Sequence, residues 1–242
     1  MDRAAPKKSR STLVLFVIIL VLVVLGAAGR ISDNADLTPA QFTKKHGSTS
    51  AEGIAQVLVN KTHPLIPATF VPSQLVVPNV PLRDNITDDE KQVSKVIQVP
   101  LQQLFAAALK DGVTLNLQSG YRSYSSQVAL YNQYVADQGQ AEADMYSAKP
   151  GHSEHQTGLA FDAGGLSKPE CNIQACYAET SEGKWLQQNS YKYGFIVRYP
   201  KDKQGITGYN YEPWHLRYIG AKDAKAFGKN PALTLEEFYK QK

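Results

Sequence analysis

The sequence predicts an α+β domain, and three observations support that class. Segments with helical periodicity and segments with strand alternation follow one another without the regular β-α-β repeat that predicts a parallel sheet. Hydrophobic residues make up 43% of the 242-residue chain and charged residues 20%, an ordinary globular composition. A glycine also stands just past several of the apolar segments, as expected where helices end.

The predicted elements begin after residues 57–82, a proline-rich segment expected to run extended and irregular along the domain surface. Spacings of three and four between apolar residues predict helices, and alternation of apolar with other residues predicts strands. We expect Ser181 to cap the third helix. The predicted helices are 99–112, 123–139, 181–194 and 233–242, and the predicted strands are 113–119, 158–164, 195–200 and 212–220.

The charge distribution excludes one class of partner. The formal net charge is +4, but four basic residues precede the first apolar run against a single acidic one, so the rest of the chain is close to neutral. Nucleic-acid binding requires a clustered basic face, which the sequence lacks. We therefore expect no nucleic-acid partner.

The N-terminal segment predicts the location of the protein. Residues 1–10 form a basic flank, and an uncharged, strongly apolar run follows at 11–29. Positive charge keeps such a flank in the cytoplasm, so we expect residues 11–29 to be a single-pass signal-anchor with the remainder outside the cell membrane. A cleaved signal peptide is the alternative, since GAAGR resembles a small-residue cleavage site. Residues 30–53 are polar and predict a linker to a domain at 54–242.

The two cysteines, Cys171 and Cys176, lie five residues apart. In an exported domain this spacing favours a local disulfide. A metal-binding pair is the alternative, although CxxxxC is not a usual zinc spacing and no further thiol could complete the site. Two free thiols are the third possibility.

The segment GHSEHQTGLAFDAG, residues 151–164, raises the main functional question. A carboxylate in the middle of a packed strand costs several kcal/mol unless it is paired or binds a metal, so Asp162 needs a partner. A turn at residues 157–158 could bring His155 beside it, and His215 in YEPWHLRY is a third candidate. Two imidazoles and one carboxylate form a catalytic zinc triad with an open position for water, and Glu212 is the nearby candidate base.

Each of these residues also has a simpler interpretation. His152 lies three residues before His155, so both could face one ion on a helical turn, or His152 could be a surface histidine beside Pro150. Asp162 could simply accept backbone hydrogen bonds, and Glu212 could be an exposed residue at a strand edge. The combination of two histidines and two carboxylates in two short motifs is less easily explained in this way.

The motifs resemble those of one family. Residues 153–162, SEHQTGLAFD, match the SxHxxGxAxD signature of the VanY-type D-alanyl-D-alanine carboxypeptidases, and residues 212–215, EPWH, match their ExxH element. SGYRS at 119–123 and VNKTHPL at 59–65 also resemble segments of that family. The resemblance covers roughly residues 55–235, and the stretch with the two cysteines has no counterpart in it.

The resemblance implies a small, mainly antiparallel sheet with flanking helices and a zinc site in a cleft on the sheet, the LAS/hedgehog-type peptidase fold. The implied zinc ligands are His155, Asp162 and His215. Glu212 would then be the catalytic base, and Arg122 would stabilise the developing oxyanion. Gln127 and Ser153 would hold the terminal carboxylate or backbone of the substrate.

The expected activity is removal of the terminal D-alanine from peptidoglycan stem peptides by a membrane-anchored zinc carboxypeptidase, with a catalytic domain that is monomeric. An L,D-carboxypeptidase that trims tetrapeptide stems has the same residues. A dipeptidase for free D-Ala-D-Ala fits less well, because that substrate is cytoplasmic. A catalytically inactive wall-binding module is the alternative from another class, but it would be expected to have lost at least one site residue.

Overall fold

A four-stranded antiparallel sheet in the order β3-β4-β6-β5 is the centre of the fold in the computed structural model, which describes residues 55–241. A two-stranded antiparallel sheet pairs β1 with β2. The strands are β1 (Leu75–Val76), β2 (Val93–Ser94), β3 (Leu115–Ser119), β4 (Ala160–Gly165), β5 (Phe195–Tyr199) and β6 (Glu212–Tyr218). Helices mixed with antiparallel sheets confirm the predicted α+β class.

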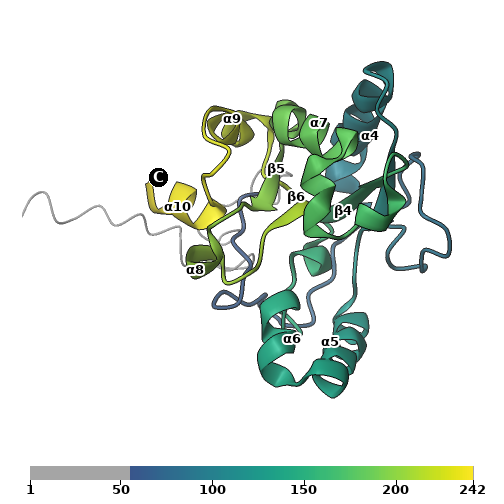
Figure 1. Cartoon of the computed structure of the whole chain (residues 1–242). Helices are drawn as coiled ribbons and strands as arrows, with labels where there is room; N and C mark the ends of the chain where they lie inside the picture. Colours follow the sequence, from purple (N-terminus) through teal and green to yellow (C-terminus); the bar gives the residue numbers. More distant parts are fainter. Residues whose placement is uncertain (1–54, 242) are drawn as a thin grey trace, which may run out of the picture. The chain divides into compact units, whose positions relative to one another are not determined.

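The helices lie around this sheet, with α4, α7 and α9 along one side of the strands and α5 and α6 together on the opposite side (Figure 1). They are α4 (Lys95–Lys110), α5 (Tyr124–Gln138), α6 (Gln140–Tyr146), α7 (Ser181–Asn189), α8 (Gln204–Thr207), α9 (Ala221–Lys229) and α10 (Leu235–Gln241). Four 3-10 turns join them: η1 (Glu154–Thr157), η2 (Pro169–Cys171), η3 (Ala175–Glu179) and η4 (Ser190–Tyr193).

The two faces of the sheet differ in chemistry. Alternate residues of a strand point to opposite faces, so each strand contributes one set of side chains to the main core. That set is apolar, and the core also takes the buried face of α4 and the apolar side of α7. From the strands, the core contains Leu115, Leu117, Phe161, Ala163, Phe195, Val197 and Leu216. The intervening positions include Asp162, Arg198, His215 and Arg217, which makes the opposite face of the sheet polar.

Helix α4 follows the predicted pattern. Its buried positions include Leu101, Leu104, Phe105 and Ala108, whose spacing puts them on one face of a helix. Burying a large apolar side chain of this kind contributes about 1.5–3 kcal/mol. The helix begins earlier than predicted because the side chain of Ser94 caps it by accepting a hydrogen bond from Val96 N.

Helix α7 differs from its prediction at both ends. Its cap is Thr180, whose hydroxyl accepts a hydrogen bond from Gly183 N at 3.0 Å, and Ser181 is the first helical residue. The predicted single helix to Gly194 is an α-helix to Asn189 followed by η4. Thr180 is the N-cap because its backbone is extended, whereas the backbone of Ser181 is already helical.

The proline-rich segment is largely irregular, as predicted, and is fastened to the domain at several points. Its backbone pairs with β3 through a bridge between Leu82 and Leu117, and Gln74 O accepts a hydrogen bond from Lys95 N at 3.0 Å. Val57, Val59 and Leu65 are buried together at its start.

The expected signal-anchor at 11–29 and linker at 30–53 lie outside the described residues. Within residues 55–241, no helix is long and apolar enough to cross a membrane.

Candidate metal centre

Asp162 occupies the middle of β4, on the polar face of the sheet. Its neighbours Phe161 and Ala163 point into the main core, so the alternation of the strand directs the carboxylate away from it. The register pairs Asp162 with His215 of β6 on one side and with Ser119 of β3 on the other. This placement explains how a strand that packs in a core can carry a carboxylate at its centre.

A tight turn brings His155 to the same place. His155 lies in η1, and Gly158 ends that turn with a φ of 65°, a conformation that side chains with a Cβ rarely adopt. A Cβ at Gly158 would also lie 2.7 Å from Ser94 N, so the close approach to Ser94 requires glycine. The chain therefore folds back at residues 157–158, as predicted.

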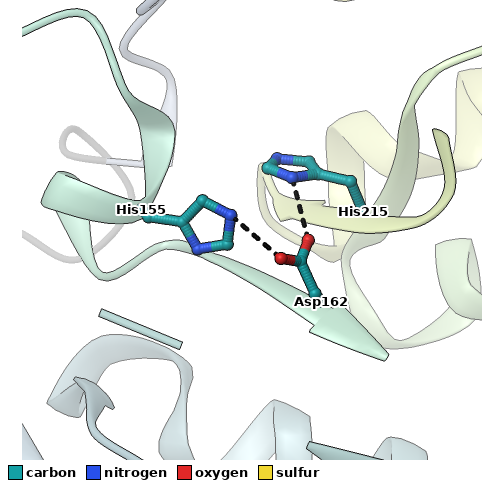
Figure 2. A group of neighbouring side chains, drawn as sticks. All are labelled: His155, Asp162 and His215. Carbon is teal, nitrogen blue, oxygen red and sulfur yellow. Dashed lines mark ion pairs between the residues drawn. The ribbon is translucent and has the colours of Figure 1, made fainter. Parts of the chain in front are cut away.

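The side chains of His155, Asp162 and His215 converge on one point (Figure 2). One donor atom from each lies within 4.8 Å of the others, and all three residues are buried. His155 Nε2 is 3.4 Å from Asp162 Oδ2, and His215 Nδ1 is 3.1 Å from Asp162 Oδ1. Among residues 55–241 this is the group of histidines and carboxylates whose geometry suits a metal ion.

The backbone determines which nitrogen of His155 faces the centre. Its Nδ1 lies 2.7 Å from the carbonyl oxygen of Gly120, which can only accept, so Nδ1 carries the proton. The lone pair is then on Nε2, which points to Asp162. Burial lowers the pKa of His155, although the nearby Asp162 opposes this shift. The lowered pKa favours the neutral ring that a metal ligand requires.

The electrostatics of the centre favour a bound cation. Asp162 Oδ1 is buried and accepts no well-aligned hydrogen bond, although His215 Nδ1 is near. Burial alone would raise the pKa of Asp162, but His155 and His215 hold it well below its usual range, so the carboxylate is ionised. Burial alone would lower the pKa of His215, but Asp162 and Glu154 raise it to about 9. Positive charge is thus stabilised between these groups.

Glu212 begins β6 and reaches the same cavity because the strand pairing is irregular there. In a regular strand, residues three apart such as Glu212 and His215 point to opposite faces. The register between β5 and β6 shifts between Val197 and Tyr199, and this irregularity turns Glu212 toward the centre. Glu212 Oε2 lies 3.8 Å from His215 Nδ1. Burial raises the pKa of Glu212 to about 8, His215 and Arg122 oppose the rise, and Asp162 adds to it.

Arg122 and Gln127 form a pair in which only the arginine lines the cavity. Arg122 donates hydrogen bonds to Gln127 Oε1 at 3.2 Å and to Ser119 Oγ at 3.1 Å. Gln127 is 1% exposed, and its amide nitrogen donates to Ser147 Oγ and to the Ala148 carbonyl. Gln127 therefore orients Arg122. Its expected contact with the substrate stays a prediction.

The cavity at the centre has a volume of about 550 Å³. Ser153 and Trp214 line it, and Tyr121 is buried without lining it. Another part of the wall comes from α5, α6 and the loop closed by the Cys171–Cys176 disulfide. Asn172 fastens this loop to the end of β4 through two hydrogen bonds with the backbone of Gly165.

Sequence reasoning missed the groups behind His215. Glu154 lies 3.3 Å from His215 Nε2 and is held by Arg198 and Arg217. Burial alone would raise the pKa of Glu154, but the two arginines hold it well below its usual range. The ring of Tyr199 packs against that of His215, with centroids 5.0 Å apart. The available signal was a charged residue inside each of the apolar strands at 195–200 and 212–220.

His152 lies apart from the centre, and its substitution provides a test of the ligand set. Its Nδ1 lies 2.9 Å from the carbonyl oxygen of Asn60, to which it donates. We expect His152→Ala to retain the metal content of the wild-type chain and to lose about 1 kcal/mol of stability with this hydrogen bond. Metal analysis by atomic emission and thermal unfolding check both parts. Loss of the metal would show that His152, and not His155, is a ligand.

The fold and the centre together define a class of protein: an α+β domain with a buried pair of histidines and a carboxylate, beside an acidic residue, in a cavity on the sheet. A family model described as the VanY D-alanyl-D-alanine carboxypeptidases matches residues 90–221. The match spans more than half of the chain, so the chain belongs to the VanY family.

Relatives and solved structures agree with this assignment. Bacillus subtilis YodJ, named a putative carboxypeptidase, is 44% identical to this chain over 184 residues. The match covers 76% of this chain and 66% of YodJ, just under two thirds of that protein. The structure of the LdcB LD-carboxypeptidase matches with 43% identity and a TM-score of 0.71, covering 77% of this chain and 87% of that one. A mutant of the vancomycin-resistance D,D-pentapeptidase VanY, solved with Zn(II), matches with 36% identity and a TM-score of 0.58 over 76% of this chain and 98% of that one.

Proposed function

We propose that the protein is a zinc-dependent D,D-carboxypeptidase that removes the terminal D-alanine from peptidoglycan stem peptides. The observation that carries the proposal is the convergence of His155, Asp162 and His215 in a cavity that Glu212 also lines. The family match and the likeness to a zinc-bound D,D-pentapeptidase support the same activity.

The residues present fit a zinc ion. Two imidazoles and one carboxylate are a donor set that catalytic zinc sites use, and Asp162 Oδ1 is a buried oxygen without a hydrogen bond that such an ion would satisfy. His155 would bind through Nε2 and His215 through Nδ1, the atoms that face Asp162. Zinc held there supplies Lewis-acid polarisation of the scissile carbonyl and acidifies a water molecule.

The other groups of the cavity have roles that follow from their positions. Glu212 takes the proton of the attacking water, and its carboxyl can then return that proton to the departing amine. Arg122, oriented by Gln127 and Ser119, presents a fixed positive charge to the oxygen on which negative charge develops. Ser153 lies at the wall of the cavity and is available to hold the substrate backbone.

An L,D-carboxypeptidase is the second candidate, because the LdcB LD-carboxypeptidase matches with a TM-score of 0.71. The centre described above serves both activities, which differ in the configuration of the residue before the scissile bond. A catalytically inactive wall-binding module is disfavoured, since the three converging residues and Glu212 are all present.

The location of the enzyme forms part of the proposal. The apolar run at 11–29 would anchor the chain in the cell membrane, and the linker at 30–53 would join it to an extracytoplasmic catalytic domain at 54–242. The support is the basic N-terminal flank and the uncharged run that follows it. This topology would place the cavity on the side of the membrane where peptidoglycan lies.

The activity is tested by incubating the full chain with zinc and defined pentapeptide or tetrapeptide stems, with and without a chelator, and measuring the product masses. We expect the pentapeptide to lose one terminal D-alanine and the chelator to prevent it. Cleavage of the tetrapeptide alone would assign the L,D activity instead. A folded, zinc-loaded protein that cleaves neither peptide would contradict both assignments and favour the binding module.

A further inference from the structure

Glu154 lies behind the metal centre, at the ring nitrogen of His215 that does not face Asp162. Its side chain is completely buried, and Oε2 is 3.3 Å from His215 Nε2. The other ring nitrogen, Nδ1, is 3.1 Å from Asp162 Oδ1. The imidazole of His215 is therefore placed between two carboxylates, only one of which belongs to the converging group.

The arginines around Glu154 determine what it can do to His215. Arg198 Nε donates to Glu154 Oε1 at 2.7 Å, and Arg217 Nη1 donates to the same oxygen at 2.8 Å. Both guanidinium groups are completely buried. A carboxylate between two such donors is ionised and can only accept hydrogen bonds. His215 must then donate from Nε2, and in the neutral ring that a metal ligand requires the lone pair is on Nδ1.

The position of this carboxylate is itself rigidly determined. Arg198 also forms a two-point contact with Glu236 of α10, with distances of 2.9 and 2.7 Å. Arg217 donates to the carbonyl oxygens of Ala55 and Val57. Strands β5 and β6 and helix α10 thus hold the two arginines, and the arginines hold Glu154.

We propose that Glu154 is a positioning residue of the metal centre, which fixes His215 in the orientation and tautomer that direct Nδ1 toward Asp162. The inference rests on the proposed function, because it takes His215 to be a ligand. Outer partners of this kind raise the basicity of a ligating imidazole, and their loss typically weakens metal binding by about 10- to 100-fold.

A purely structural role for Glu154 predicts a different result. If the carboxylate served only to neutralise Arg198 and Arg217, its loss would lower stability without a specific effect on the metal. Glu182 provides a matched control. It is also a buried carboxylate, but it accepts its hydrogen bonds from Leu166, Ser167 and Ser181 and contacts neither His215 nor the two arginines.

The test compares Glu154→Gln with Glu182→Gln in the full chain. Zinc affinity is measured by competition with a chromogenic chelator, and thermal unfolding is recorded for both metal-free variants. A carboxamide has one acceptor oxygen, which cannot serve two guanidiniums and His215 together. We expect Glu154→Gln to bind zinc about 10- to 100-fold more weakly and Glu182→Gln to keep the wild-type affinity. Unchanged affinity in Glu154→Gln, or an equal loss in both variants, would overturn the inference.

A second measurement uses the wild-type chain and so remains decisive if Glu154→Gln fails to fold. Long-range ¹⁵N–¹H correlation spectra report which ring nitrogen of a histidine carries the proton. We expect His215 in the zinc-loaded protein to be protonated at Nε2 and unprotonated at Nδ1, and the reverse assignment would overturn the inference. A wild-type chain that binds no zinc would refute the proposed function as well, which distinguishes the two failures.

Discussion

Replacing Glu212 with glutamine should abolish turnover while the protein keeps its zinc. Glutamine has nearly the same shape but cannot accept the proton of the attacking water or return it to the leaving amine. Positioned acid–base groups of this kind contribute about 10²- to 10⁴-fold, so we expect kcat to fall by that factor. Glu212 Oε2 lies 3.8 Å from His215 Nδ1 and is not one of the three converging groups, so zinc content should stay at the wild-type value.

The measurement is product formation from the pentapeptide stem, with zinc content determined on the same samples. Glu179→Gln is the matched control, because Glu179 is an exposed carboxylate 3.4 Å from Lys184 and does not line the cavity. The control should retain full activity. If Glu212→Gln also remained fully active, Glu212 would not be the base and the proposed mechanism would be wrong.

Asp162→Asn should remove both the metal and the activity. Asp162 supplies the one anionic donor of the centre, and it faces His155 and His215 through its two oxygens. A neutral carboxamide gives a weaker oxygen ligand and turns an N–H₂ group toward one of the imidazoles. Because loss of an outer partner alone costs up to about 100-fold in metal affinity, we expect loss of this ligand to cost more.

Zinc-dependent thermal stabilisation measures this effect directly. An ion present at 100 times its dissociation constant stabilises a folded protein by about 2.7 kcal/mol, so wild-type protein should melt at a higher temperature with zinc. Asp162→Asn should lose that increase, whereas Asp137→Asn, a substitution of an exposed residue on α5, should keep it. An undiminished zinc-dependent increase in Asp162→Asn would exclude Asp162 as a ligand.

Local sequence features predicted much of the fold. The buried face of α4 was readable because a helix repeats every 3.6 residues and its apolar residues follow that period. Strand β4 was predicted from the glycines at its two ends. Asp162 was identified as a candidate site residue because a carboxylate between Phe161 and Ala163 requires a partner. The predicted cap of α7 was one residue off, since Thr180 and Ser181 are both good caps and only the backbone distinguishes them.

The groups behind the centre were not predicted. The reasoning that singled out Asp162 applies equally to Arg198 and Arg217, which are charged residues inside apolar strands and are completely buried. Their shared partner, Glu154, lies in a short 3-10 turn that carries no strand or helix periodicity. The partners of Gln127 were not predicted either: its amide group is hydrogen-bonded to Arg122, Ser147 and Ala148.

The sequence by itself determined the α+β class, the strand that carries Asp162 and the two motifs that supply the imidazoles, because residue type and periodicity are local properties of the chain. Tertiary structure alone decided which nitrogen of each histidine faces Asp162, that Glu212 turns toward the cavity, and that Glu154 supports His215. These features depend on the register of β6 against β4 and β5, and on carbonyl and guanidinium partners far away in sequence. The register is fixed only when strands that are distant in sequence pair, and a slip of one residue would turn every side chain to the other face of the sheet.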